Sequence, residues 1–356
     1  MKKVAIIGTQ GVPAKYGGFE TLVENIIGEN CSNNVQYTIF CSSINLPNGP
    51  KEYKGAKLKY IPLYANGAYS IPYDIISMIR CIRGYDAVLI LGVSGCVFMP
   101  IFKLLCRGKI IVNIDGLEHR RAKWKNYVRK ILKLSEKLAV RYADEIITDN
   151  KGIQDYAKQI YGVETSLITY GGDHTIMEVT PEREKEVLEE YGVAKEDYFI
   201  SVCRIEPENN CHVTLEAFAN SDKRLIFIGN WECNGYSRKL KEQYGKGYKN
   251  IALVDSLYDI EVLHILRKNA KMYIHGHCAG GTNPSLVEAM FMGRPILAYD
   301  VVYNRETTFN KAFYYDNVES LANLMEREEL DGTIMTELAQ NNYTWKKIAS
   351  QYESLY

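Results

Sequence analysis

The stretch MYIHGHCAGGTNPSLVEAMFMGRPILAY, residues 272–299, contains a complete strand–helix–strand pattern. An apolar run at 272–275 leads into a glycine-rich loop, and a helical segment follows that ends near Gly293. A second apolar run at 295–299 completes the pattern. Short apolar runs on either side of a helix are typical of parallel sheets built from β-α-β units, so this stretch predicts an α/β fold.

The same pattern recurs along the chain, whose 356 residues give room for two domains of ordinary size. It restarts after an acidic helical stretch at 181–191. We therefore expect one domain over 1–172, a second over 173–340, and a C-terminal helix over 341–356 that packs back on the first. The predicted strands are 4–7, 37–41, 58–61, 87–91, 110–114, 145–148, 198–202, 224–228, 251–254, 272–275 and 295–299.

The composition is that of a globular protein, with 46% hydrophobic and 24% charged residues. Basic and acidic residues number 43 each, and this zero net charge excludes a generally basic nucleic-acid-binding protein. The balance is uneven, because residues 1–172 carry 23 basic and 14 acidic side chains and residues 173–356 carry 20 and 29. This asymmetry indicates two domains with different partners, and chance clustering is the alternative.

Nine cysteines are scattered without a C-x-x-C pair, which favours reduced thiols in a cytoplasmic protein and disfavours a zinc site. The apolar run after Lys3 is too short for the core of a signal peptide and predicts a first strand instead. Residues 87–105 carry only one charge, Lys103, but glycines and a proline interrupt them. We expect a strand, a turn and a buried helix there rather than a membrane span.

A glycine-rich turn, GTQGVPAKYGGFE, follows the first predicted strand at 8–20. Such a turn before a helix can present backbone N–H groups to a phosphate. Its spacing matches neither the dinucleotide fingerprint nor the P-loop, which disfavours a nicotinamide enzyme or an ATPase. A purely structural turn is the alternative.

The segment DGLEHRR at 115–121 follows the predicted strand at 110–114. Asp115, Glu118 and His119 could orient or deprotonate a hydroxyl nucleophile there. Asp115 could equally serve only as the cap of the following helix.

A basic helix is predicted after this segment, because residues 120–141 hold nine Lys or Arg and a single acid, Glu136. Its apolar residues Tyr127, Ile131, Leu134 and Leu138 share one face. Such a helix suits an anionic membrane surface, and a solvated outer face is the alternative. The residues expected to form the membrane or acceptor patch are Arg120, Arg121, Lys123, Lys130, Lys133 and Lys137.

Two residues of the second half could contact an anionic nucleotide. Arg204 follows the predicted strand at 198–202 and could bind a diphosphate, although a surface salt bridge would look the same. Glu288 is the one acid on an apolar helix face and needs a partner, such as the hydroxyls of a ribose. His275 and His277 lack an evident third ligand, so we expect no metal.

Arg204, Glu288 and their neighbours resemble the motifs of a known glycosyltransferase family. The segment 280–293 is similar to the E-x7-E region of the retaining GT-B glycosyltransferases in the large family numbered four. Glu288 matches the second glutamate, which in that family holds the donor's ribose, and Gly280 stands where the first glutamate is usual. Arg204 matches the arginine that binds the diphosphate, whereas Asn209 stands in the place of the usual lysine.

Longer phrases resemble a bacterial subgroup of rhamnosyltransferases that build cell-surface polysaccharides. They are IIGTQGVPAKYGGFET, DGLEHRRAKW, ADEIITDNKGI and IHGHCAGGTNPSLVEAM. The resemblance implies a GT-B fold with two Rossmann-like domains facing across a cleft. It also implies a deoxythymidine-diphosphate rhamnose donor and a polyprenyl-diphosphate-linked saccharide as acceptor. No metal or other cofactor is expected, and the protein would be cytoplasmic, peripheral on the inner face of the cell membrane.

The resemblance also implies roles for particular residues. Asp115 stands where the family commonly has a histidine and becomes the candidate to assist the acceptor hydroxyl. The catalytic candidates are Asp115, Arg204 and Glu288. The donor-binding candidates are Gly17, Gly18, Arg204, Asn209, Gly281, Thr282, Asn283 and Glu288.

Two other functions fit the same architecture. A sugar-nucleotide epimerase would act on a soluble substrate and would not need the basic helix. A non-catalytic module that binds nucleotide sugars or glycans would account for the missing glutamate and lysine. Both remain alternatives because one fold supports many functions.

Overall fold

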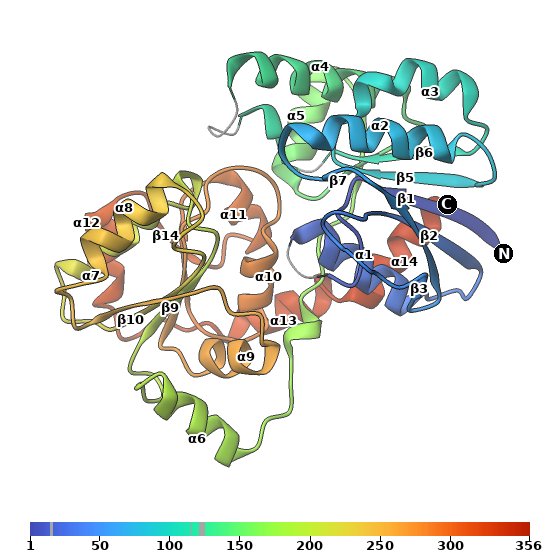
Figure 1. The fold of residues 1–356 in the computed structure, drawn as a ribbon. Coiled ribbons are helices and arrows are strands. Elements are labelled where there is room, and N and C mark those ends of the chain that lie inside the picture. The colour runs from blue at the N-terminus through green and yellow to red at the C-terminus, as the bar shows by residue number, and fades with distance from the viewer. Residues whose placement is uncertain (15–16, 115, 121–124) are drawn as a thin grey trace. The chain divides into compact units, whose positions relative to one another are not determined.

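The computed structural model describes residues 1–14, 17–114, 116–120 and 125–356 (Figure 1). These residues form two compact units, Met1–Tyr170 with Trp345–Tyr356 (unit 1) and Gly171–Thr344 (unit 2). Each unit is a mainly parallel sheet covered by helices on both faces, as the alternation of strand and helix predicts.

Unit 1 holds a sheet with the order β3-β4-β2-β1-β5-β6-β7-β8. All neighbouring strands of this sheet pair in parallel except the short pair β3 and β4. The strands are β1 (Lys2–Ile7), β2 (Val35–Ser42), β3 (Glu52–Tyr53), β4 (Ala56–Ile61), β5 (Ala87–Leu91), β6 (Lys109–Asn113), β7 (Glu145–Thr148) and β8 (Ser166–Leu167). The helices are α1 (Gly18–Glu29), α2 (Ser70–Cys81), α3 (Met99–Leu105), α4 (Asn126–Tyr142), α5 (Lys151–Tyr161) and α14 (Trp345–Leu355).

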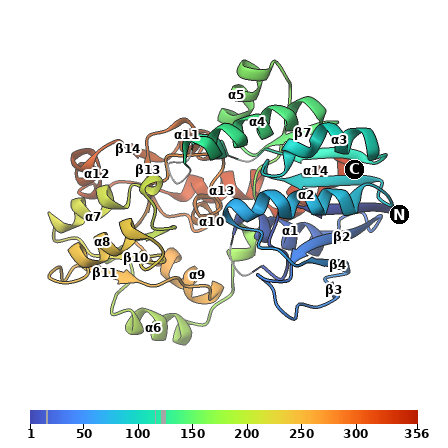
Figure 2. The ribbon, with the colours of Figure 1, turned by 45° about the horizontal axis from the view of Figure 1, so that its top comes forward.

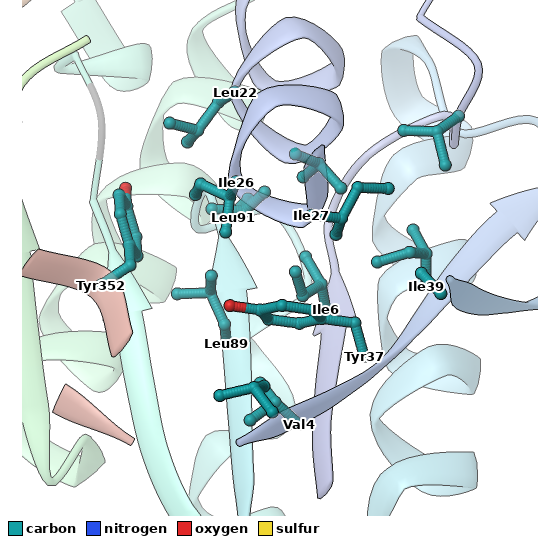
Figure 3. Close-up of a cluster of buried hydrophobic side chains, with 14 of the residues drawn as sticks. Val4, Ile6, Leu22, Ile26, Ile27, Tyr37, Ile39, Leu89, Leu91 and Tyr352 are labelled. Atoms are coloured by element: carbon teal, nitrogen blue, oxygen red, sulfur yellow. The ribbon is translucent and has the colours of Figure 1, made fainter. Parts of the chain in front are cut away.

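Helices α1 and α14 cover one face of this sheet, and α2, α3 and α4 cover the other (Figure 1). On the first face, apolar side chains of β1 and β5 pack against α1 and against Tyr352 of α14 (Figure 3). The Tyr352 hydroxyl also accepts a hydrogen bond from Asn113 Nδ2 at 2.8 Å, which ties α14 to β6. Helix α14 is thus a built-in part of the unit 1 core.

Unit 2 holds a fully parallel sheet with the order β11-β10-β9-β12-β13-β14. Its strands are β9 (Phe199–Val202), β10 (Leu225–Ile228), β11 (Ile251–Val254), β12 (Met272–His275), β13 (Ile296–Tyr299) and β14 (Phe313–Tyr315). Its helices are α6 (Pro181–Glu190), α7 (Cys211–Ala219), α8 (Gly235–Tyr244), α9 (Ile260–Lys268), α10 (Pro284–Met290), α11 (Val302–Thr307), α12 (Val318–Met325) and α13 (Thr333–Asn342).

Two apolar clusters enclose the sheet of unit 2. One lies against α6, α9, α10 and α13, and the other lies against α7, α8 and α12. Figures 1 and 2 show where these helices lie around the sheet. Strand β12 contributes to both, because Tyr273 points into the first cluster while Met272 and Ile274 point into the second. This central strand therefore carries the glycine loop that follows it on a rigid base.

The predicted strands form at or within two residues of their expected bounds, whereas β3, β8 and β14 were not predicted. The buried helix expected after β5 is only partly buried. Ile101, Leu104 and Leu105 of α3 are 52%, 85% and 51% exposed, because only its other side, with Met99 and Phe102, meets the core. Among the described residues, no helix is long and apolar enough to cross a membrane.

Candidate functional site

The loops after β9 and β12 are joined to each other at the carboxyl edge of the unit 2 sheet, where ligands of parallel sheets bind. Asn210 Nδ2 donates to the Gly276 carbonyl at 2.9 Å, and the Cys278 N–H donates to the Glu208 carbonyl at 2.8 Å. A Cβ on Gly276 would lie 2.2 Å from the Asn209 carbonyl oxygen, so this close approach requires glycine. The two segments that carry the predicted donor-site residues therefore form one layer.

Asn209 is engaged by other parts of this layer through both ends of its side-chain amide. Its Nδ2 donates to the Arg204 carbonyl at 2.7 Å, and its Oδ1 lies 2.7 Å from His277 Nδ1. The side chain is 3% exposed. The His277 carbonyl in turn accepts from Asn304 Nδ2 at 2.8 Å. Asn209 thus fixes the backbone of Arg204, which is a role that its place in the sequence did not suggest.

Arg204 is half-buried at the end of β9. Within the part of the chain that the structure describes, no residue hydrogen-bonds or ion-pairs with its guanidinium. The alternative of a simple surface salt bridge is therefore not seen among the described residues. A guanidinium held at the backbone but without a carboxylate partner is suited to binding an anion.

Glu288 lies on α10 and is paired with a cation that the sequence analysis did not single out. Its Oε2 lies 2.8 Å from Arg267 Nη2, and its Oε1 lies 3.8 Å from His174 Nε2. Arg267 comes from α9 and is 3% exposed, whereas Glu288 retains 16% exposure. The carboxylate is therefore neutralised from the protein side and still reachable from outside.

The glycine loop before α10 is partly buried and ends in a side-chain cap of that helix. Asn283 is the N-cap of α10, and its Oδ1 accepts from the Ser285 N–H at 3.0 Å and from the Ser285 hydroxyl at 2.8 Å. Thr282 is buried, and Gly281 is half-buried. Gly280, in the place of the family's first glutamate, has a φ of +95°, a conformation that favours glycine.

His275 lies at the end of β12 and is fully enclosed, so burial lowers its pKa to about 3 and keeps the ring neutral. Its Nε2 has no hydrogen-bond partner among the described residues. The same residues contain no group of three His, Cys, Asp or Glu side chains that could hold a metal ion.

In unit 1, the glycine turn after β1 is tied together by Glu20 of α1. Glu20 Oε1 accepts from the Thr9 hydroxyl at 2.9 Å and from the Gln10 N–H at 2.7 Å. Burial raises the pKa of this carboxyl, and the hydrogen bonds oppose the rise. Gly17 has a φ of +121°, and a Cβ there would meet Glu20 Oε2 at 2.0 Å. The turn that holds Gly17 and Gly18 is therefore braced by a buried acid.

Four of the predicted acceptor-side residues, Asp115, Arg121, Lys123 and the Arg120 side chain, lie outside what the structure describes. Their roles remain predictions. His119 next to them is described, and its Nδ1 lies 2.8 Å from Glu136 Oε2.

Glu136 is the centre of a buried cluster on α4. Its Oε1 accepts from the Tyr156 and Tyr161 hydroxyls at 2.8 and 2.6 Å and from Lys133 Nζ at 3.0 Å. Burial by itself would raise the pKa of Glu136. The hydrogen bonds from these donors and from His119 outweigh burial and lower the pKa to about 2. Lys133, predicted to face a membrane, is thus engaged with Glu136 and with Tyr156.

The remaining basic residues of α4 border an exposed apolar stripe. Tyr127, Ile131 and Leu134 are 64%, 39% and 51% exposed, while the buried face of α4 consists of other residues, including Val128 and Leu132. Helix α3, with its own exposed apolar side chains, packs beside α4 (Figures 1 and 2). We call the exposed surface of α3 and α4 the α3–α4 face. The exposed cations on or next to these two helices are Arg107, Lys125, Arg129, Lys130, Lys137 and Arg141.

Comparisons with known proteins agree with this architecture. The chain is similar to the sucrose-phosphate synthase of Thermosynechococcus elongatus, with 16% identity and a TM-score of 0.83 over 100% of this chain and 98% of that one. It is also similar to HepE of Anabaena in complex with UDP-glucose, with 15% identity and a TM-score of 0.76 over 99% of both chains. The catalytic domain of starch synthase IV from Arabidopsis thaliana, bound to ADP and acarbose, gives 12% identity and a TM-score of 0.73 over 99% and 98%.

These likenesses establish the GT-B fold that the sequence predicted. Residues 183–345, nearly all of them in unit 2, match the family described as Glycosyl transferases group 1. Residues 1–173 match a Domain of unknown function (DUF1972). No curated protein matches the chain. The match over 183–345 supports glycosyltransferase activity.

Proposed function

We propose that the protein is a glycosyltransferase that moves L-rhamnose from deoxythymidine-diphosphate rhamnose, with retention, onto a polyprenyl-diphosphate-linked saccharide. The observation that carries the transferase class is the half-buried Arg204 guanidinium. It has no protein partner among the described residues and stands at the end of β9 in a Glycosyl transferases group 1 domain. The sugar and the acceptor rest on the likeness of the longer sequence phrases to rhamnosyltransferases.

On the donor side, the guanidinium of Arg204 would compensate the charge of the nucleotide diphosphate as it leaves. Backbone N–H groups of residues 281–283 would add to this stabilisation of the diphosphate. The side chain of Asn283 has a separate role, because it caps α10. The Glu288 carboxylate would accept a hydrogen bond from the 3′ hydroxyl of the donor's deoxyribose. Gly17 and Gly18 would bring backbone N–H groups to the donor phosphates, on a turn that Glu20 holds in place.

In the reaction, the bond between the sugar's anomeric carbon and the diphosphate oxygen breaks. A new bond forms from that carbon to the acceptor hydroxyl oxygen, on the same face of the ring. The hydroxyl proton passes to a base, for which Asp115 is our candidate, or to the departing diphosphate. The diphosphate leaves with the electron pair of the broken bond, and no redox partner is required.

We also propose that the α3–α4 face rests on an anionic membrane, where a lipid-linked acceptor would be found. Exposed apolar side chains such as Leu104 and Leu134 lie between exposed lysines and arginines. This pattern is typical of a protein surface that binds reversibly to the membrane–water interface. Each Lys or Arg near such a surface contributes about 1 kcal/mol. Lys130 and Lys137 are exposed, whereas Lys133 is held by Glu136.

The decisive experiment offers radiolabelled deoxythymidine-diphosphate rhamnose, and UDP-glucose as a competing donor, together with polyprenyl-diphosphate-linked saccharides. We expect label to move from the rhamnose donor to the lipid fraction, and Arg204→Ala to abolish the transfer. Transfer from UDP-glucose alone would contradict the proposed sugar. If neither transfer to lipid nor donor hydrolysis occurs with any donor, the proposed activity is wrong.

The alternative of a sugar-nucleotide epimerase is not favoured, because the matching family is one of glycosyl transferases. Conversion of the donor to an isomer without any acceptor would nevertheless support it. A non-catalytic binding module would lose nucleotide-sugar binding in Arg204→Ala and Glu288→Ala without turnover ever being observed.

A further inference from the structure

Arg267 is a buried arginine that directs its guanidinium to the side chain proposed to hold the donor. It lies near the end of α9, is 3% exposed, and places Nη2 2.8 Å from Glu288 Oε2. Its Nε is buried without a hydrogen-bond partner among the described residues. Burying an arginine whose N–H donors are only partly hydrogen-bonded lowers the stability of the fold. Stability alone therefore does not explain why an arginine stands at this position.

The groups that face Glu288 come from three elements of unit 2. Arg267 of α9 contacts one carboxylate oxygen, and His174, from the turn at Asp173–Thr175, lies 3.8 Å from the other. Tyr273 of β12 lies close enough to interact electrostatically with both Arg267 and Glu288. Of the two contacts with the carboxylate, that of Arg267 is the shorter.

We propose that Arg267 is the positioning residue of the ribose site. It holds Oε2 of Glu288, so that the remaining acceptor capacity of the carboxylate points to a sugar hydroxyl of a nucleoside diphosphate. This inference rests on the proposed function, in which Glu288 contacts the donor. Arg267 itself is buried behind the carboxylate and acts only through it.

The ion pair fixes the orientation of the carboxylate. The planar guanidinium at 2.8 Å from Oε2 limits rotation of the Glu288 carboxylate and leaves Oε1 as the acceptor for a ligand hydroxyl. Without Arg267, the Glu288 side chain would lose this fixed orientation, and binding of the sugar hydroxyl would weaken.

The test compares the wild-type chain with Arg267→Met by calorimetric titration with UDP and dTDP, and with their analogues that lack the sugar hydroxyls. These hydroxyls are 2′ and 3′ in UDP and 3′ alone in dTDP, whose sugar is 2′-deoxyribose. We expect Arg267→Met to lose about tenfold or more in affinity for UDP and dTDP, since a hydrogen bond to a charged group is affected. Affinity for the analogues should stay unchanged. An equal loss for both kinds of ligand would show a merely structural role and overturn the inference.

Two further variants keep the test decisive. Arg267→Lys retains a buried cation but not the planar guanidinium, so it should fold even if Arg267→Met does not, and should show a smaller but still hydroxyl-dependent loss. In a Glu288→Gln background, Arg267→Met should cause no further loss for UDP or dTDP. A full additional loss in that background would overturn the inference, because Arg267 would then act independently of Glu288.

The matched control is Arg305→Met in the same unit. It breaks an exposed ion pair in which Arg305 Nε lies 2.5 Å from Asp300 Oδ1. It should leave all affinities unchanged. If the wild-type chain binds no nucleoside diphosphate, the proposed function fails and the inference fails with it. If the wild type binds with a preference for ribose hydroxyls that Arg267→Met and Arg267→Lys both retain, the inference alone is wrong.

Discussion

The Oδ1 atom of Asn209 lies 2.7 Å from His277 Nδ1, and this contact links the loop after β9 to the loop after β12. The resemblance to family-four enzymes would place a diphosphate-binding lysine at this position. The structure instead places the side chain inside the protein, where its Nδ2 supports the Arg204 carbonyl. The absent lysine is thus replaced by a residue that orders the neighbouring arginine.

Asn209→Leu should therefore destabilise the chain and weaken nucleotide binding. Both hydrogen bonds are lost. The Arg204 carbonyl keeps the Glu206 N–H as a donor, so the main cost falls on His277 Nδ1, which loses a buried hydrogen bond, and we expect a loss of about 1–3 kcal/mol of unfolding free energy. Denaturant titration would measure this, and UDP or dTDP affinity would report the position of Arg204. Asn220→Leu, which removes an exposed hydrogen bond from Asn220 Nδ2 to the Glu216 carbonyl, is the control and should cost less. A stable variant with unchanged affinity would contradict the role of Asn209.

Asn209→Lys should not restore a family-like donor site. The new ammonium would enter a position that is 3% exposed, beside His277, and an uncompensated buried charge is unfavourable. We expect a lower melting temperature and no gain in affinity for a nucleoside diphosphate. Tighter binding in this variant would show that the lysine can reach the ligand.

Glu136 should make unit 1 sensitive to acid. Its pKa is about 2 in the folded protein against 4.5 for an ordinary glutamate, so its stabilising effect is full above pH 4.5 and is lost as the pH falls through 2. This difference corresponds to about 3 kcal/mol. Glu136→Gln should lower stability at pH 7 and flatten the loss between pH 4.5 and 2, as measured by denaturant titration. An identical pH dependence in both proteins would refute this.

Asp74 of α2 should have the opposite effect. It is buried, and burial raises its pKa from 3.8 to about 8, although the Gly95 N–H donates to it. The unfolded chain releases this proton above pH 3.8 while the folded chain retains it. The contribution of Asp74 to stability is therefore full below pH 3.8 and declines by about 1.4 kcal/mol per pH unit until the pH passes 8.

Asp74→Asn retains an acceptor for the Gly95 N–H and removes the titration. We expect it to raise the melting temperature at pH 8 and to have little effect at pH 4. Thermal unfolding at both pH values measures this. A stabilisation of equal size at the two pH values would show that the carboxyl group does not titrate as expected.

Membrane binding should depend on the exposed cations of α4 and not on Lys133. Lys130→Glu with Lys137→Glu should release the chain from anionic vesicles in a sedimentation assay, and Leu104→Ser with Leu134→Ser should weaken binding through loss of apolar contact. Lys151→Glu with Lys158→Glu, on exposed positions of α5, is the matched control. If binding survives the reversal at 130 and 137, the α3–α4 face is an ordinary solvated surface.

The α4 helix shows what a sequence can and cannot reveal about this protein. Its residues form two apolar stripes, one with Tyr127 and Ile131 and one with Val128 and Leu132. Periodicity detects both stripes equally well, but only tertiary packing decides which one meets the sheet. Most strands, by contrast, are short apolar runs with largely buried side chains, so their places were predictable from composition alone. The exceptions are β3, β8 and β14, which are two or three residues long, have at most one buried residue each and were missed.

The candidate site divides in the same way. Arg204 and Glu288 were predictable because each stands at a recognisable place next to a strand or on an apolar helix face. Arg267 was not, since it precedes Glu288 by 21 positions on another helix and its own surroundings resemble a helix end with ordinary basic residues. The need of Glu288 for a partner was foreseeable, but the identity of that partner depends on how α9 and α10 pack.

Helix α14 affects the order in which the chain can fold during synthesis. Trp345, Ile348 and Tyr352 fill the unit 1 core next to α1, yet the ribosome makes them after all of unit 2. Unit 1, although translated first, therefore lacks part of its core until α14 has been made. Unit 2 can complete its core before that point. For this protein, the usual expectation that the amino-terminal domain matures first is reversed.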